Sequence, residues 1–226
     1  MDKQKILVVD DEERMRKLVR DFLIKSDYGV IEAADGDQAI DVFFEKRQEI
    51  ALIVLDVMMP GRDGYEVCRE IREYDKKVPI IMLTAKSEER DELQGFREGA
   101  DEYISKPFSP KILVARISAI LRRSGAGEEG KVLEAEGIRV DQAARSVVID
   151  GNAVDLSYKE YELLVYFMEN KGIALDREKI LNNVWNYDYF GDARTIDTHV
   201  KKLRSKMGEK GDLIKTIWGV GYKFEA

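Results

Sequence analysis

Five short apolar runs alternate with amphipathic helical patterns between residues 5 and 120, and this alternation constrains the fold more than any other feature. The runs have the length of buried strands; they are Ile6–Val9, Val30–Ile31, Ala51–Leu55, Ile80–Leu83 and Tyr103–Ile104. Between and after them, apolar residues recur three or four positions apart, as on one face of a helix. Strict alternation of strands and helices predicts an α/β fold with a doubly wound, five-stranded parallel sheet.

Residues 124–130 interrupt this pattern with three glycines among small and charged residues, which is typical of a flexible linker. Beyond them the sequence predicts short strands with turns, including Val147–Ile149 followed by the hairpin signal Asp150-Gly151. A capping box at Ser157–Glu160 begins one helix; we expect two more at about 177–184 and 193–207, and a closing hairpin within 213–224. We therefore expect a domain at 1–123, a linker at 124–130 and an α+β domain at 131–226.

Polar residues follow four of the predicted strands directly: Asp10, Asp11, Asp56, Thr84 and Lys106. Because ligands of open parallel sheets bind at the carboxyl ends of the strands, these side chains are expected at one rim. Neighbouring carboxylates repel one another, and oxygen ligands favour Mg²⁺. Asp56 ends the expected central strand and is the predicted nucleophile that forms an aspartyl phosphate. Lys106 and Thr84 would bind phosphoryl oxygens.

Four motifs closely resemble the receiver domains of two-component response regulators over residues 4–123: Val8–Glu12, Leu55–Gly61, Leu83–Ala85 and Lys106–Phe108. The resemblance implies a flavodoxin-like sheet and phosphorylation of Asp56 by a sensor histidine kinase. It also implies that Asp11, Asp56 and the Met58 carbonyl hold Mg²⁺, with Asp10 acting mainly through water, and that the Lys106–Pro107 peptide bond is cis.

The same resemblance implies a switch in which Thr84 and Tyr103 move on phosphorylation, and a homodimer that forms on activation through ion pairs. The residues expected on this dimer face are Asp101, Glu102, Arg116 and Arg123. Glu92 and Ile112 stand where relatives commonly carry a basic–acidic pair, so one pair is missing here.

The net charge of −7 argues against strong general affinity for nucleic acid. Locally, residues 194–206 hold five basic residues against Asp197 alone. A helix over 193–207 places Ile196, Val200, Leu203 and Met207 on a core stripe. The opposite face carries donors and cations that suit a major groove. On charge alone, a solvated helix face is the better interpretation.

Several motifs favour DNA binding instead, because they resemble the OmpR/PhoB-type winged-helix effector domain over about 131–226: Leu156–Leu164, Asp176–Leu181, Val184–Trp185, Arg194–Val200 and Gly219–Tyr222. The resemblance implies that promoter DNA is bound by the helix at about 193–207, through Arg194, Thr195, Thr198, Lys201, Lys202, Arg204 and Ser205. It implies contact with RNA polymerase through the loop at about 185–192, and a hairpin wing. We expect Trp218 to pack against the domain and His199 to be a packed helix residue.

Three alternatives remain: a phosphorylation-independent regulator, a phosphohydrolase and a nucleotide-binding fold. Asp56-Val57-Met58 lacks the second acid of a phosphohydrolase, so we expect no turnover of a separate substrate. Asp10-Asp11-Glu12 stands where a nucleotide site needs a glycine-rich loop. The sequence shows neither a leader peptide nor an apolar run approaching the roughly 18 residues of a membrane span, so a cytoplasmic protein is expected.

Overall fold

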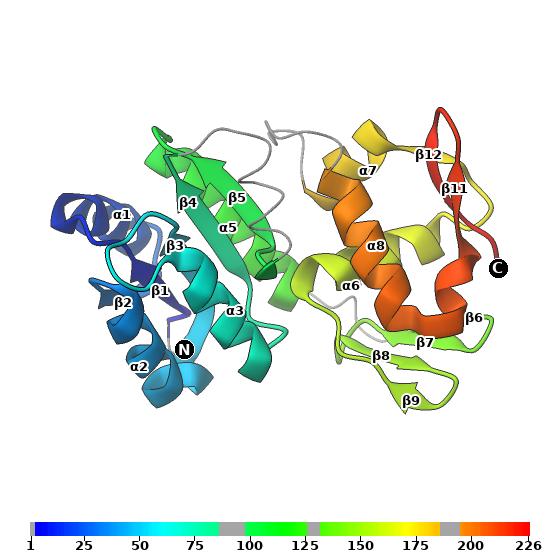
Figure 1. Cartoon of the computed structure of the whole chain (residues 1–226), viewed down its shortest axis with the longest axis horizontal. Helices are drawn as coiled ribbons and strands as arrows, with labels where there is room; N and C mark the ends of the chain where they lie inside the picture. Colours follow the sequence, from blue (N-terminus) through cyan, green and yellow to red (C-terminus); the bar gives the residue numbers. More distant parts are fainter. Residues whose placement is uncertain (1–2, 86–97, 126–131, 186–194) are drawn as a thin grey trace. The chain divides into compact units, whose positions relative to one another are not determined.

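The computed structural model describes residues 3–85, 98–125, 132–185 and 195–226. The chain divides into two compact units, the N-terminal unit (1–123) and the C-terminal unit (124–226) (Figure 1). None of the helices in these described ranges has the length and apolar character to cross a membrane.

A five-stranded parallel sheet forms the middle of the N-terminal unit (Figure 1). Its strands are β1 (Lys5–Val9), β2 (Gly29–Ala33), β3 (Ile50–Asp56), β4 (Ile80–Thr84) and β5 (Glu102–Ser105). Their order, β2-β1-β3-β4-β5, is that of flavodoxin-like folds and puts β3 in the centre, as the sequence predicts. Almost every residue of β3 and β4 is buried, which explains why both read as continuous apolar runs.

Helices flank this sheet: α1 (Glu13–Lys25), α2 (Gly36–Lys46), α3 (Gly64–Tyr74) and α5 (Pro110–Gly125), with a 3₁₀ turn at Arg47–Glu49. Asp35 and Asp63 cap α2 and α3 by accepting hydrogen bonds from backbone N–H groups in the first turn. The helix expected around Leu93 and Phe96 lies outside the described residues. α5 continues through Gly125, so residues 124 and 125 are helical, although the sequence predicted that the linker begins at 124.

The C-terminal unit begins with a four-stranded antiparallel sheet of β6 (Val132–Ala135), β7 (Ile138–Asp141), β8 (Ser146–Ile149) and β9 (Asn152–Ala153). Asp150 and Gly151 both have positive φ, 48° and 83°, as the predicted two-residue hairpin turn requires.

Three helices follow, α6 (Tyr158–Glu169), α7 (Arg177–Val184) and α8 (Thr195–Met207), and a 3₁₀ turn spans Gly208–Leu213. The capping box at Ser157 and Glu160 begins α6 as predicted. A second antiparallel sheet, in the order β10-β12-β11, contains β10 (Leu175–Asp176), β11 (Ile214–Ile217) and β12 (Gly221–Phe224). The expected core stripe of α8 is buried: Ile196, Val200, Leu203 and Met207.

Candidate functional site

The ends of three neighbouring strands bring Asp10, Asp56 and Thr84 to one rim of the parallel sheet. The register aligns Val9 with Leu55 and Asp56 with Leu83, so the polar residues that end or follow β1, β3 and β4 lie side by side. All three side chains are buried. The structure thus assembles the carboxylates and hydroxyl that the sequence places at the strand ends.

Lys106, just after β5, reaches across this rim to both buried carboxylates. Its Nζ lies 2.8 Å from Asp10 Oδ2 and 2.9 Å from Asp56 Oδ2. The Lys106 backbone N–H donates to the Thr84 carbonyl, which ties the residue to the end of β4. The Lys106–Pro107 peptide bond is cis, as expected.

At this site, burial and the neighbouring opposite charges shift the pKa values of Asp56 and Lys106 in opposite directions. Burial raises the pKa of Asp56 above its ordinary value, and the Lys106 ammonium only partly offsets this effect. Burial also disfavours the charged form of Lys106, yet hydrogen bonds to Asp10 and Asp56 raise the pKa of Lys106 overall. Lys106 therefore stays a cation at neutral pH, held where a transferred anionic group would need one.

The acidic groups of the rim fit a hard divalent cation. Carboxylate oxygens of Asp10, Asp11 and Asp56 lie within 4.8 Å of one another, and Asp11 is exposed to solvent. Such a set matches the oxygen ligands that Mg²⁺ takes in proteins, usually with several waters retained. Met58 also lies at the rim, where its backbone N–H donates to Asp56 Oδ1 at 3.4 Å.

The start of α3 packs directly against the loop that follows Asp56. A side chain at Gly64 would place its Cβ 2.2 Å from the Asp56 carbonyl oxygen, so this position requires glycine. The Gly64 N–H donates to the Val57 carbonyl at 3.1 Å. The next residue, Tyr65, lies with its hydroxyl 3.1 Å from that of Tyr103 on β5, and both rings are buried. The tyrosine predicted to switch thus faces the helix that abuts the acceptor loop.

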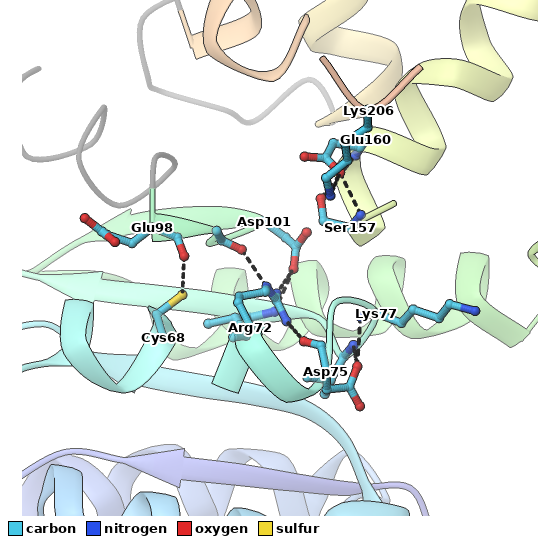
Figure 2. Close-up of polar contacts among 12 residues, drawn as sticks. Cys68, Arg72, Asp75, Lys77, Glu98, Asp101, Ser157, Glu160 and Lys206 are labelled. Atoms are coloured by element: carbon cyan, nitrogen blue, oxygen red, sulfur yellow. Dashed lines mark hydrogen bonds and ion pairs between the residues drawn. The ribbon is translucent and has the colours of Figure 1, made fainter. Parts of the chain in front are cut away.

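The described residues of the expected dimer face have partners within the N-terminal unit. Asp101 accepts a hydrogen bond from Arg72 Nη2 at 2.7 Å (Figure 2). It also accepts one from the Ile80 N–H at 2.9 Å. Glu102 forms an ion pair with Arg116. Asp101 therefore joins α3 to the start of β5, a role that the sequence did not indicate. The side chain of Arg123 and all of Glu92 lie outside the described residues, and Ile112 is exposed.

The polar face of α8 divides into an exposed part and a part bound to its own domain. Lys201 and Ser205 are exposed, and Thr198 and Lys202 are half-buried. Thr195, in contrast, is only 1% exposed. Arg204 is engaged with the β11–β12 hairpin, since its Nε donates to the Ile214 carbonyl at 3.0 Å. The structure thus separates these two residues from the exposed face; Arg194 and residues 186–192 of the expected polymerase loop are outside the described ranges.

Trp218 differs from its expected role. It lies in the turn between β11 and β12, next to Gly219, whose φ is +76°. The indole is 91% exposed, so it does not pack against the domain as predicted. Trp218 belongs to the three-residue turn that follows the last paired residues of the hairpin, Ile217 and Gly221.

Two buried polar residues of the C-terminal unit, His199 and Lys159, pack against the ring of Trp185. His199 is buried in α8 as expected, with its ring centroid 4.9 Å from that of Trp185. Lys159 is also buried, and its Nζ donates to the Val184 carbonyl at 2.7 Å. Sequence analysis missed this lysine, because nothing in an amphipathic pattern separates a lysine that binds a helix end from a solvated one.

Comparison with protein families gives two matches along the chain. The response regulator receiver domain matches residues 6–118. The transcriptional regulatory protein C-terminal domain matches residues 151–224. The first match contains the acidic rim and Lys106, and the second contains α6 to β12.

Full-length relatives have the same combination. The chain is 50% identical to the transcriptional regulatory protein ResD of Bacillus subtilis over 232 residues, which cover 98% of the chain and 95% of ResD. It is 44% identical to SrrA of Staphylococcus aureus, with 97% and 95% covered.

Solved structures show this architecture too. The response regulator DrrB, an OmpR/PhoB homologue from Thermotoga maritima, is 34% identical over all of both chains, with a TM-score of 0.53. The chain therefore belongs to the OmpR/PhoB family of two-component response regulators, in which a receiver domain is joined to a DNA-binding transcriptional regulatory domain.

Proposed function

We propose that Asp56 accepts a phosphoryl group from a sensor histidine kinase and that this modification controls promoter binding by the C-terminal unit. The observation that carries the proposal is the position of Lys106 Nζ, within 2.9 Å of both Asp10 and Asp56 at the carboxyl rim of the sheet. A carboxylate nucleophile beside a fixed cation is the arrangement that phosphoryl transfer needs, because the transferred group is anionic.

In the proposed step, an Asp56 carboxylate oxygen attacks phosphorus and the bond from phosphorus to the kinase histidine nitrogen breaks. Lys106 pairs with one phosphoryl oxygen, and the Thr84 hydroxyl donates to another. Asp10, Asp11, Asp56 and the Met58 carbonyl would hold Mg²⁺, which supplies positive charge to the phosphoryl oxygens when bound. Lys106 must exchange its contact with Asp56 for one with the phosphoryl group, so the rim rearranges on modification.

The exposed face of α8 is the proposed contact with duplex DNA. Thr198, Lys201, Lys202 and Ser205 offer hydroxyl donors and ammonium groups to bases and phosphates. Arg194 belongs to the same proposal from sequence, as does contact of the loop at about 185–192 with RNA polymerase.

We further propose that activated receivers form a homodimer in the cytoplasm. Glu102 and Arg116 would then exchange their mutual ion pair for pairs across the dimer, together with Arg123. The carboxylate of Asp101 already binds Arg72 and a backbone N–H, so it is expected to stabilise β5 and not to pair across an interface.

Measurement of promoter-DNA affinity with and without a phosphodonor tests the proposal. Treatment with acetyl phosphate and Mg²⁺ should raise the affinity of the wild type at least 10-fold. Asp56→Asn should bind as the untreated wild type does, with no response. Equal binding by the wild type in both states would support a phosphorylation-independent regulator.

Turnover of a chromogenic phosphate ester beyond one equivalent would support the phosphohydrolase instead. We expect none, because Met58 occupies the position of the second acid and brings no carboxyl group.

A further inference from the structure

A cluster of four side chains joins three elements of the C-terminal unit. Arg177 begins α7, Asp197 and Arg204 belong to α8, and Tyr222 lies in β12 (Figure 1). Asp197 accepts hydrogen bonds from Arg177 Nε at 2.8 Å and from the Tyr222 hydroxyl at 2.7 Å. Arg177 Nη2 reaches the second Asp197 oxygen at 3.4 Å, so the ion pair is bidentate.

Two guanidinium groups lie near the ring of Tyr222. The Arg177 and Arg204 guanidinium carbons are 5.3 and 5.5 Å from the ring centroid, within the range of cation–π contacts. Burial and the hydrogen bond to Asp197 raise the pKa of Tyr222 to about 12. The phenol therefore stays protonated and keeps donating to Asp197 at any physiological pH.

Arg204 extends the cluster to the other strand of the hairpin. Its Nε donates to the Ile214 carbonyl at 3.0 Å, and its Nη2 donates to the Thr216 hydroxyl at 2.9 Å, both in β11. α8 is thus bound to β12 through Asp197 and to β11 through Arg204. Gly221 allows β12 to pack closely against β10, because a Cβ there would lie 2.3 Å from the Leu175 carbonyl oxygen.

Asp197 places an acidic group in the first turn of the helix that is proposed to meet DNA. It is the one acidic residue of α8, among the basic residues that would contact phosphates. A negative charge there opposes DNA binding by simple electrostatics. Its contacts with Arg177 and Tyr222 offer a reason for the acid, since they connect the helix to the hairpin.

We propose that Asp197, Tyr222 and Arg204 are positioning residues for DNA recognition, which fix the orientation of α8 against the β11–β12 hairpin so that both elements fit one duplex together. The inference rests on the proposed DNA contact of α8. Ordering the two elements before binding favours a particular site, because less conformational freedom is lost when the complex forms.

Binding of two duplexes by the full chain tests this role. One duplex is selected by the phosphodonor-treated wild type from a random pool, and the other has the same base composition in scrambled order. Asp197→Asn and Tyr222→Phe should each lose about 10-fold in affinity for the selected duplex and change little on the scrambled one. Glu209→Gln is the matched control, since it removes the same charge from an exposed acid, and it should bind both duplexes at least as well as the wild type.

The outcome for Asp197→Asn separates positioning from charge. A purely electrostatic role predicts tighter binding of both duplexes once the acid is removed, and that result would overturn the inference. A loss of equal size on both duplexes with a lowered thermal midpoint would also overturn it, because that pattern indicates damaged folding. Tyr222→Phe keeps the buried ring and the net charge, so it tests the hydroxyl contact alone.

Arg204→Lys gives an independent test. A phosphate contact needs only positive charge, so it predicts near wild-type binding for the lysine variant. A positioning role needs the guanidinium fork. It predicts that Arg204→Lys and Arg204→Gln both lose the preference for the selected duplex over the scrambled one, to the same extent. If the wild type selects no duplex from the pool, the proposed DNA-binding role of α8 itself fails; if it does and the variants match it, only the positioning role fails.

Discussion

Asp56 carries its charge in a place where burial disfavours that charge. The carboxylate is 2% exposed and depends on Lys106 for compensation, and Lys106 also serves Asp10. Active sites commonly retain such groups at a cost in stability, because the same desolvation strengthens interactions with a reacting group. The position of Asp56 is therefore better explained by chemistry than by folding.

Asp56→Asn should raise the thermal midpoint of the metal-free protein at neutral pH by a few degrees. Burial raises the pKa of Asp56, so ionisation favours the unfolded chain at pH values above the folded-state pKa. The gain should shrink as the pH falls toward the ordinary carboxyl value of about 4, where the unfolded carboxyl also becomes protonated. Calorimetry in EDTA measures this, with the exposed Asp41→Asn as control; an equal midpoint for wild type and Asp56→Asn at pH 7 would contradict it.

His199 makes the stability of the C-terminal unit depend on pH. Burial, assisted by the charges of Lys202 and Lys159, lowers the pKa of His199 from 6.5 to about 3. The neutral imidazole makes its full contribution to the free energy of unfolding above pH 6.5. This contribution is lost as the pH falls toward 3, because in that range His199 takes up a proton in the unfolded state and not in the folded state. Between pH 7.5 and 5.5 the loss should be about 1 kcal/mol.

Urea unfolding followed by tryptophan fluorescence measures this loss selectively, because both tryptophans of the chain, Trp185 and Trp218, belong to the C-terminal unit. His199→Gln, which does not titrate, should remove most of the pH dependence. The same loss in the variant would show that other groups cause it.

The β11–β12 hairpin presents an apolar ring to solvent beside a helix that carries the proposed DNA contacts. Trp218 is 91% exposed, and a side chain of that size is rarely left in water. Such a ring suits contact with the sugars and base edges of a groove, where shape and apolar surface matter more than charge.

Trp218→Ala should lower DNA affinity about 10-fold and leave its salt dependence unchanged, because the indole neutralises no phosphate. Trp218→Arg should steepen the slope of log affinity against log salt by about 0.9, the value for one added phosphate contact. Anisotropy titrations at several salt concentrations measure both quantities. Unchanged affinity for the alanine variant would show that the ring stays outside the complex.

The spacing of apolar residues predicted the helices and strands well, because the buried face of each element sets that spacing within a few residues of the chain. The strands of the N-terminal unit, the capping box at Ser157 and the stripe of α8 depend on neighbours a few residues away. Contacts between distant residues left no such trace: Arg72 binds Asp101 and Arg177 binds Asp197 across 29 and 20 residues. The rim of the sheet was predictable because parallel topology places strand ends together, whereas the partners of Arg204 and the exposure of Trp218 depend on the three-dimensional hairpin.

Over the whole molecule, the proposed modification and the proposed DNA contacts belong to different units. The acidic rim and Lys106 lie in residues 1–123, and α8 and the hairpin lie in residues 124–226. Neither unit carries the net positive charge of a general DNA binder, since residues 1–123 have a net charge of −4 and residues 124–226 a net charge of −3. Binding should therefore depend on correct presentation of a small basic surface, which makes it suited to control by a covalent change in the other unit.

The Ser157–Glu160–Lys206 contacts show how the C-terminal unit holds α8 in place from its far end. The Glu160 carboxylate accepts from the Ser157 N–H at 2.8 Å and also pairs with Lys206 (Figure 2). α8 is thus anchored near both ends, at Asp197 and at Lys206, and the exposed residues lie between these anchors.

Intact mass after incubation with acetyl phosphate and Mg²⁺ tests the central claim most directly, because it counts the phosphoryl groups that the chain accepts. The wild type should gain one phosphoryl group, about 80 Da, which Asp56→Asn should lack and which EDTA added beforehand should prevent. An equal gain by Asp56→Asn would contradict the assignment of the acceptor. No gain by the wild type, even with an active histidine kinase as donor, would contradict phosphorylation as the control of this regulator.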